Sequence, residues 1–158
     1  MILTSYTACM NWALIQEGVE VEIEPINEEE AKQFYELVKA TSKSNLWDEV
    51  IVSIISEEVE GYKNSMLILA AYEGEELLGI IRTVGDGATI VFVQDILVFP
   101  DKQRLGVGTA LLKAILDKYK NVRQIELATD NTPKTIAFYK SVGFLEFSEI
   151  GCCGFMRC

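Results

Sequence analysis

The stretch that decides the fold is DILVFPDKQRLGVGTALLKAIL, residues 95–116. An apolar run typical of a strand ends at a proline, and a helical pattern begins at the glycines Gly106 and Gly108. The first amides of a helix have no partners within the helix, and glycine lets an anion approach them closely. Lys102 and Arg104 add positive charge at the same place. The stretch therefore predicts a loop that binds a phosphorylated ligand.

The common nucleotide-binding loops fit this stretch poorly. A Walker loop requires a lysine directly after its last glycine, whereas Thr109 follows Gly108. A dinucleotide fingerprint requires a third glycine at the position of Leu111, and a strand-helix-strand unit around it. Local spacing alone also leaves open an ordinary tight turn between a strand and a helix.

Composition narrows the class of protein. The chain has 158 residues and no low-complexity tract, which predicts one domain over residues 19–158 and an N-terminal extension over residues 1–18 that packs on it or belongs to it. No apolar run reaches the length of a membrane span, and the N-terminus lacks a basic signal-peptide region, so we expect a cytoplasmic protein without a membrane partner. The net charge of −10 argues against a nucleic-acid partner.

The charge is unevenly distributed along the chain. Residues 1–100 hold 18 acidic and 5 basic residues, a net charge of −13, whereas residues 101–158 hold 6 acidic and 9 basic residues, a net charge of +3. An acidic protein with a locally basic helix entrance suggests an anionic ligand there and a cationic ligand elsewhere.

The cysteines do not form a metal-binding pattern. The chain has no histidine, and the spacing of its four cysteines lacks the C-x-x-C pairs of structural zinc sites. We therefore expect no metal and reduced thiols, with a redox role as the minor alternative. These cysteines are Cys9, Cys152, Cys153 and Cys158.

The order of the expected elements predicts an α+β domain with a mixed sheet. A strand over 19–26 is followed by helices within 28–60, and three antiparallel strands follow with turns at Gly74 and at 85–87. The helix after Gly108 leads to a strand over 123–129. The next helix has Thr132 as its cap, Pro133 at its first position and Gly143 after its end, and residues 144–150 and 154–158 suggest a closing hairpin.

Two motifs resemble the GNAT superfamily of N-acetyltransferases. Gln103-x-x-Gly106-x-Gly108, after the strand that ends near Val98, resembles that family's acetyl-CoA pyrophosphate loop. Residues 131–144, with Ala137-Phe138-Tyr139 and then Gly143-Phe144, are similar to a later helix of the family. The separation of the two motifs, one helix and one strand, fits as well. The resemblance covers residues 19–155 in element order, and the helices at 28–60 match only in placement.

The resemblance implies a central, mostly antiparallel twisted sheet of about six or seven strands with a parallel splayed pair, flanked by about four helices. Acetyl-CoA would lie in the splayed gap, with its pantetheine arm along the first strand of the pair and its pyrophosphate on the loop. The residues expected to hold it are Ile96, Leu97, Val98, Gln103, Arg104, Leu105, Gly106, Val107, Gly108, Thr109 and Asn131.

Acetyl transfer to an amine needs a group that takes a proton and a group that gives one to the leaving thiolate. Without histidine, the proton is taken by a carboxylate acting through water, or the amine is deprotonated beforehand by the electrostatic field of the site. Asp95 is the first candidate for such a carboxylate, and Glu126 and Asp130 are weaker ones. Alternatively, Asp95 is an edge or salt-bridged carboxylate without a catalytic role. Tyr139 matches the family's acid, although Ile136, Tyr139 and Val142 share a helical face that is also typical of core residues.

These features together indicate an N-acetyltransferase that moves an acetyl group from acetyl-CoA to a primary amine of a small molecule or peptide, by direct attack in a ternary complex. The acceptor is expected to be cationic, and a homodimer is left open. The alternative function is a non-catalytic acyl-CoA-binding or sensing module on the same fold, which would not need Tyr139.

Overall fold

The computed structural model describes residues 14–16, 19–25 and 64–157. Its strands lie in one sheet in the order β1-β2-β3-β4-β5-β6. Neighbours from β1 to β5 are antiparallel, and β5 and β6 are parallel. The strands are β1 (Leu14–Gln16), β2 (Val19–Pro25), β3 (Leu67–Glu73), β4 (Glu76–Gly85), β5 (Ile90–Val98) and β6 (Gln124–Leu127).

This mixed sheet with one parallel pair confirms the expected fold class. The expected numbers of strands and helices stay predictions, because the helices placed at 28–60 lie outside the described residues. Two α-helices lie within them, α4 (Val107–Lys118) and α5 (Pro133–Ser141).

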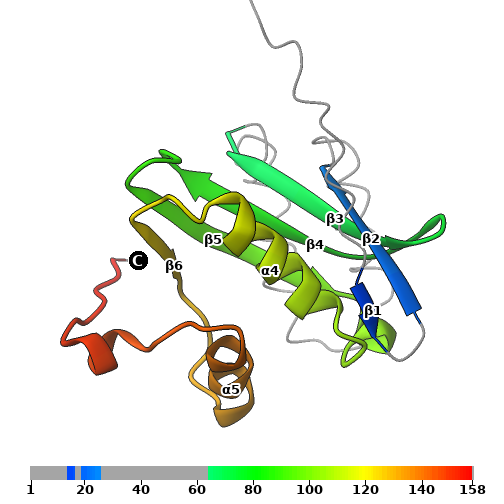
Figure 1. Cartoon of the computed structure of the whole chain (residues 1–158). Coiled ribbons are helices and arrows are strands. Elements are labelled where there is room, and N and C mark those ends of the chain that lie inside the picture. Colours follow the sequence, from blue (N-terminus) through cyan, green and yellow to red (C-terminus); the bar gives the residue numbers. More distant parts are fainter. Residues whose placement is uncertain (1–13, 17–18, 26–63, 158) are drawn as a thin grey trace, which may run out of the picture. The chain divides into compact units, whose positions relative to one another are not determined.

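The chain forms two compact units, residues 1–127 and residues 128–158. In the first unit, α4 packs against the sheet and contacts β2, β3, β4 and β5 (Figure 1). The predicted helix is confirmed, and it is amphipathic, since Leu111, Leu112 and Ile115 are fully buried. Together with the central residues of β3 and β4, this face of α4 forms the core of the described part of the unit.

Both predicted turns of the meander are confirmed. Gly74 adopts a φ of +59° between β3 and β4, a conformation that glycine tolerates best. Between β4 and β5, the Asp86 carboxylate accepts hydrogen bonds from the amides of Ala88, Thr89 and Ile90 at 2.7–3.0 Å. These bonds, with one from the Thr89 hydroxyl as the largest cause, hold the pKa of Asp86 well below its usual range.

In the second unit, the predicted ends of α5 are confirmed. Thr132 is the N-cap and accepts a hydrogen bond from the amide of Thr135 at 3.3 Å, and Pro133 is the first helical residue. The chain leaves the helix through Gly143, whose φ of +100° matches a glycine after a helix end.

The predicted closing hairpin is wrong within the described residues. Residues 147–150 instead form a short 3₁₀-helix, η2 (Phe147–Ile150), and no strand lies between 144 and 157. A reciprocal capping box between Glu146 and Glu149 closes this turn, and the Lys140 ammonium lies 2.6 Å and 3.2 Å from their carboxylates. Local polar contacts therefore stabilise a helical turn where the sequence suggested a strand.

None of the helices in the described ranges is long and apolar enough to cross a membrane.

Candidate functional site

The loop between β5 and α4 has an unusual backbone. After β5 the chain makes a short 3₁₀-turn, η1 (Pro100–Lys102), and then reaches α4 through Arg104 at a φ of +67° and Gly106 at a φ of +86°. Within the described ranges, Arg104 is the only residue other than glycine with a positive φ. That conformation costs a side-chain-bearing residue about 1–2 kcal/mol. Such strain is typical of ligand-binding loops, where the surrounding structure holds it in place.

The start of α4 leaves its backbone amides open to an outside acceptor. Gly106 is the N-cap and has no side chain to cap the helix, and the first turn holds no acidic residue. The first amide bonded in the helical manner is that of Ala110, which donates to the carbonyl of Gly106 at 2.9 Å. In the described part of the chain, the amides from Gly106 to Thr109 have no acceptor. With the helix dipole, they form a place for an anion.

Of the two cations near this helix start, only Arg104 is available to a ligand. The ammonium of Lys102 lies 2.8 Å from the carboxylate of Glu76 on β4, and this contact raises its pKa. Lys102 therefore compensates Glu76, contrary to its expected role at the anion site. The side chain of Arg104 is exposed and forms no ion pair with the other described residues.

The strand before the loop has a free edge. The parallel pairing of β5 with β6 runs from Ile90 to Val93, and β5 continues to Val98 with only β4 beside it among the described strands. The predicted separation of the parallel pair is therefore present at the end of β5. A free strand edge offers unpaired amides and carbonyls to an extended ligand.

Only some of the residues expected on this edge present their polar groups to it. The amide of Phe99 donates to Leu78 on β4 at 3.1 Å, and successive residues of an antiparallel pair alternate in direction. The backbone groups of Leu97 therefore face β4, while those of Ile96 and Val98 face away from it. The geometry favours Ile96 and Val98 as backbone contacts of a ligand and disfavours Leu97.

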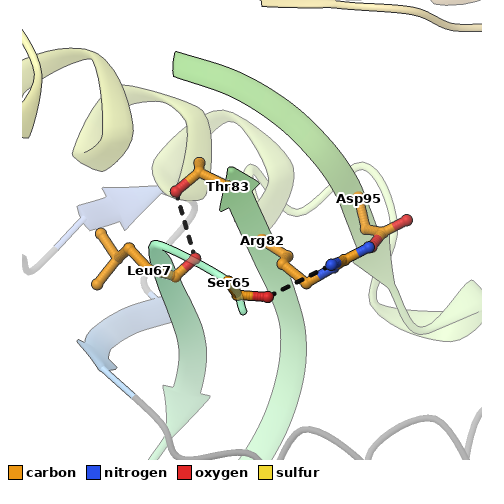
Figure 2. Close-up of polar contacts among 5 residues, drawn as sticks. All are labelled: Ser65, Leu67, Arg82, Thr83 and Asp95. Carbon is orange, nitrogen blue, oxygen red and sulfur yellow. Dashed lines mark hydrogen bonds and ion pairs between the residues drawn. The ribbon is translucent and has the colours of Figure 1, made fainter. Parts of the chain in front are cut away.

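Asp95, the first candidate base, is engaged in an ion pair. Figure 2 shows the side chains of Arg82 and Asp95 pointing toward one another from neighbouring strands. The Nε atom of Arg82 lies 2.6 Å from an Oδ atom of Asp95, and the two side chains are 5% and 16% exposed. The Arg82 guanidinium also donates to the Ser65 hydroxyl at 3.3 Å. The salt-bridged interpretation thus describes Asp95, and a role as the base stays a prediction.

The other candidate bases also have partners. The carboxylate of Glu126 accepts a hydrogen bond from the Gln124 side chain at 3.0 Å. Asp130 accepts bonds from the hydroxyls of Thr129 and Thr135, each at 3.2 Å. Hydrogen bonding, most of all with Thr132, lowers the pKa of Asp130, which makes it a weaker base.

Tyr139 lies on α5 in the second unit. Asn131 lies in the loop before α5, in the same unit. The ring of Tyr139 meets those of Phe138 and Phe144 edge to face, with centroids 5.0 Å and 6.0 Å apart. Burial raises the pKa of the Tyr139 phenol, and a hydrogen bond with Thr129 opposes this effect. The phenol is therefore protonated at neutral pH, as a proton donor must be.

The ion-pair partner of Asp95, which the sequence interpretation missed, is Arg82. A single arginine within the apolar strand LLGIIRTV, residues 77–84, was a signal for it, because a buried arginine requires an acidic partner. Among the described residues, no cluster of side chains suited to a metal ion occurs, and Cys152 and Cys153 are exposed free thiols.

Comparisons with known proteins address the identity of the chain. The sequence pattern of the Acetyltransferase (GNAT) family matches residues 23–144. A solved GNAT family acetyltransferase from Streptococcus pneumoniae is 32% identical, with 87% of this chain and 97% of that chain covered at a TM-score of 0.70. A PaiA N-acetyltransferase from Thermoplasma acidophilum, solved in complex with coenzyme A, is 18% identical and shares the fold, with 79% and 89% covered at a TM-score of 0.61.

A curated relative, the uncharacterized N-acetyltransferase ycf52 from Pyropia yezoensis, is 28% identical over 91 residues, which are 53% of this chain and 51% of that protein. The chain thus spans about half the length of the curated relatives it matches. The family pattern covers well over half of the chain, and it includes both the glycine loop and Tyr139. The chain belongs to the GNAT family of acetyltransferases.

Proposed function

We propose that this protein is an N-acetyltransferase that transfers the acetyl group of acetyl-CoA to a primary amine. The observation that carries this function is the start of α4, where the amides from Gly106 to Thr109 have no acceptor among the described residues and lie beside the exposed Arg104. A pyrophosphate supplies the negative charge and the oxygen acceptors that these groups need. Family membership supports the same ligand.

The free edge of β5 would hold the rest of the co-substrate. The outward amides of Ile96 and Val98 and the outward carbonyl of Ile96 suit an extended arm that carries amide groups of its own. Acetyl-CoA supplies an activated acetyl thioester. An outward amide at the same edge is suited to stabilise negative charge that develops on the acetyl oxygen.

The transfer forms a carbon–nitrogen bond to the acceptor and breaks the carbon–sulfur bond of the thioester. The amine must lose a proton, which a carboxylate takes through water in this proposal, because the chain has no histidine. The phenol of Tyr139 donates a proton to the departing thiolate. Its raised pKa keeps that proton in place until the thiolate forms.

The acceptor is proposed to be a small molecule or peptide with a cationic amine. Residues 1–100, which carry a net charge of −13 from 18 acidic and 5 basic residues, would attract such amines at a rate that depends on salt. Much of this acidic sequence lies outside the described residues. Measuring kcat/KM for matched amines of charge +2, +1 and 0, at low and high salt, tests the assignment. Equal values that do not change with salt would reject it.

Two measurements on the wild-type chain test the function itself. Titration calorimetry should show that CoA binds, and thiol release from acetyl-CoA should depend on the added amine. CoA binding without release to any member of a broad amine panel would instead indicate the acyl-CoA-binding module. A chain that binds no CoA would contradict both functions.

A further inference from the structure

The register between β4 and β5 shifts at one place. Arg82 pairs with Asp95 and Thr83 pairs with Val93, so Gln94 has no partner on β4. An extra residue of this kind is a β-bulge, which bends its strand and increases the local twist. The pairing of β5 with β6 also ends at Val93. The bulge therefore stands where the free edge of β5 begins.

A part-buried ion pair crosses the strands directly beside this bulge. Arg82 is 4% exposed, and its Nε atom lies 2.6 Å from a carboxylate oxygen of Asp95. A charge-assisted bond of this kind is directional, and either partner left alone in such a place would be strongly unfavourable. Asp95 follows the bulge residue Gln94 directly in the sequence. The ion pair between Arg82 and Asp95 therefore holds β5 against β4 immediately after the bulge.

The neighbouring residues Arg82 and Thr83 on β4 bond to different strands. The hydroxyl of Thr83 donates to the carbonyl of Leu67 on β3 at 3.3 Å, whereas Arg82 bonds to Asp95 on β5 (Figure 2). The Arg82 guanidinium also reaches Ser65, just before β3. Polar contacts thus link β3, β4 and β5 at the level of the bulge.

We propose that Arg82 and Asp95 are positioning residues that hold the bulge and so direct the outward backbone groups of Ile96 and Val98 toward the co-substrate. This inference rests on the proposed function. It assigns Asp95 to the geometry of the acetyl-CoA edge and not to proton transfer. Loss of the pair should let β5 pair with β4 in a shifted register after Gln94, which would turn the outward groups toward β4.

The test is Asp95→Asn, which removes the charge and keeps the size of the side chain. The Kd for CoA should rise about 5- to 150-fold, as expected for the loss of two hydrogen bonds. Hydrogen exchange should accelerate at residues 95–99 and not at 90–93. The matched control is Ile115→Val on the buried face of α4, which lowers stability without touching the bulge. Its Kd for CoA should stay at the wild-type value.

The double variant Arg82→Gln/Asp95→Asn guards against a failure to fold, because it removes both charges of the pair together. It should lose CoA affinity to the same extent as Asp95→Asn, since the two residues act as a unit. A double variant with wild-type affinity would overturn the inference.

Other outcomes also separate the alternatives. If Asp95→Asn keeps the Kd for CoA but lowers kcat and removes the rising acid limb of its pH profile, Asp95 is a base and the positioning role is wrong. If it lowers only Tm, as Ile115→Val does, the pair is merely structural and the positioning role is again wrong. A wild-type chain that binds no CoA would overturn the proposed function, and this inference with it.

Discussion

The side-chain amide of Gln103 donates a hydrogen bond of 3.3 Å to the carbonyl oxygen of Val98. This bond joins the loop before α4 to the last residue of β5, across the 3₁₀-turn η1. This hydrogen bond gives a structural reason for the glutamine in the motif Gln103-x-x-Gly106-x-Gly108, because it links the end of β5 to the loop before α4. The carbonyl of Val98 faces away from β4, which leaves it free to accept this bond.

Gln103→Ala should raise the Kd for CoA about 2- to 10-fold, because one hydrogen bond that positions the loop is lost. Gln103→Arg keeps a donor at this place and should stay closer to the wild-type value. Calorimetric titration of both variants with CoA is the measurement. Equal losses for Ala and Arg would show that the bond to Val98 has no part in binding.

Arg104→Gly should change stability and affinity in opposite directions. Glycine adopts the φ of +67° without strain, so Tm should rise or stay level, although glycine also loses more entropy on folding. The loss of the exposed guanidinium should weaken CoA binding about tenfold, the effect of one charge-assisted hydrogen bond. Thermal melts and CoA titrations at low and high salt measure both effects. Unchanged affinity at low salt would remove Arg104 from the site.

Gly108→Glu places a negative side chain in the first turn of α4. A carboxylate there suits the helix dipole, so the variant should fold, but it should repel the pyrophosphate and raise the Kd for CoA by about 100-fold or more. Gly108→Ala is the matched control, and the proposed backbone contacts tolerate it better. Gly106→Glu should also weaken binding, with added strain from the φ of +86°. Well-folded glutamate variants with wild-type affinity would rule out the loop as the anion site.

Tyr139→Phe should leave the Kd for CoA nearly unchanged and lower kcat about 10- to 1000-fold, because it removes only the phenolic proton. The aromatic contacts with Phe138 and Phe144 are retained, so Tm should change little. Phe138→Leu serves as a control for packing on the same helix. Steady-state rates and a pre-steady-state burst test this result. If kcat is unchanged while chemistry limits the rate, the acid is another residue.

Asp86→Asn should lower Tm at neutral pH and have a smaller effect at low pH. The folded pKa of Asp86 is depressed, so its contribution to stability is fully present above the unfolded value of about 3.9 and is lost gradually as the pH falls from there toward the folded value. The melting temperatures of the two proteins should therefore begin to converge below about pH 4. Circular dichroism melts from pH 7 down to pH 3 measure this convergence. A constant difference in Tm across that range would contradict the assignment.

The sequence by itself determined the features whose causes are local. Thr132 and Pro133 begin α5 and Gly143 follows its end, because capping and φ preferences act within a few residues. The glycine loop before α4 was equally readable, since unpaired amides at a helix start follow from helix geometry alone. The meander followed from its turn residues and from the apolar runs between them.

Only the tertiary structure decided which charges and backbone groups are available to a ligand. Lys102 is close to the glycine loop in the sequence, yet its ammonium forms an ion pair with Glu76 on β4. The sequence indicated Asp95 as a candidate base. The structure shows that Arg82, thirteen residues earlier in the sequence, is its ion-pair partner on the neighbouring strand. The direction of Ile96 and Val98 depends on strand pairing beyond the bulge. Contacts of this kind join residues distant in sequence, and their register is set by the packing of whole strands, which no local pattern encodes.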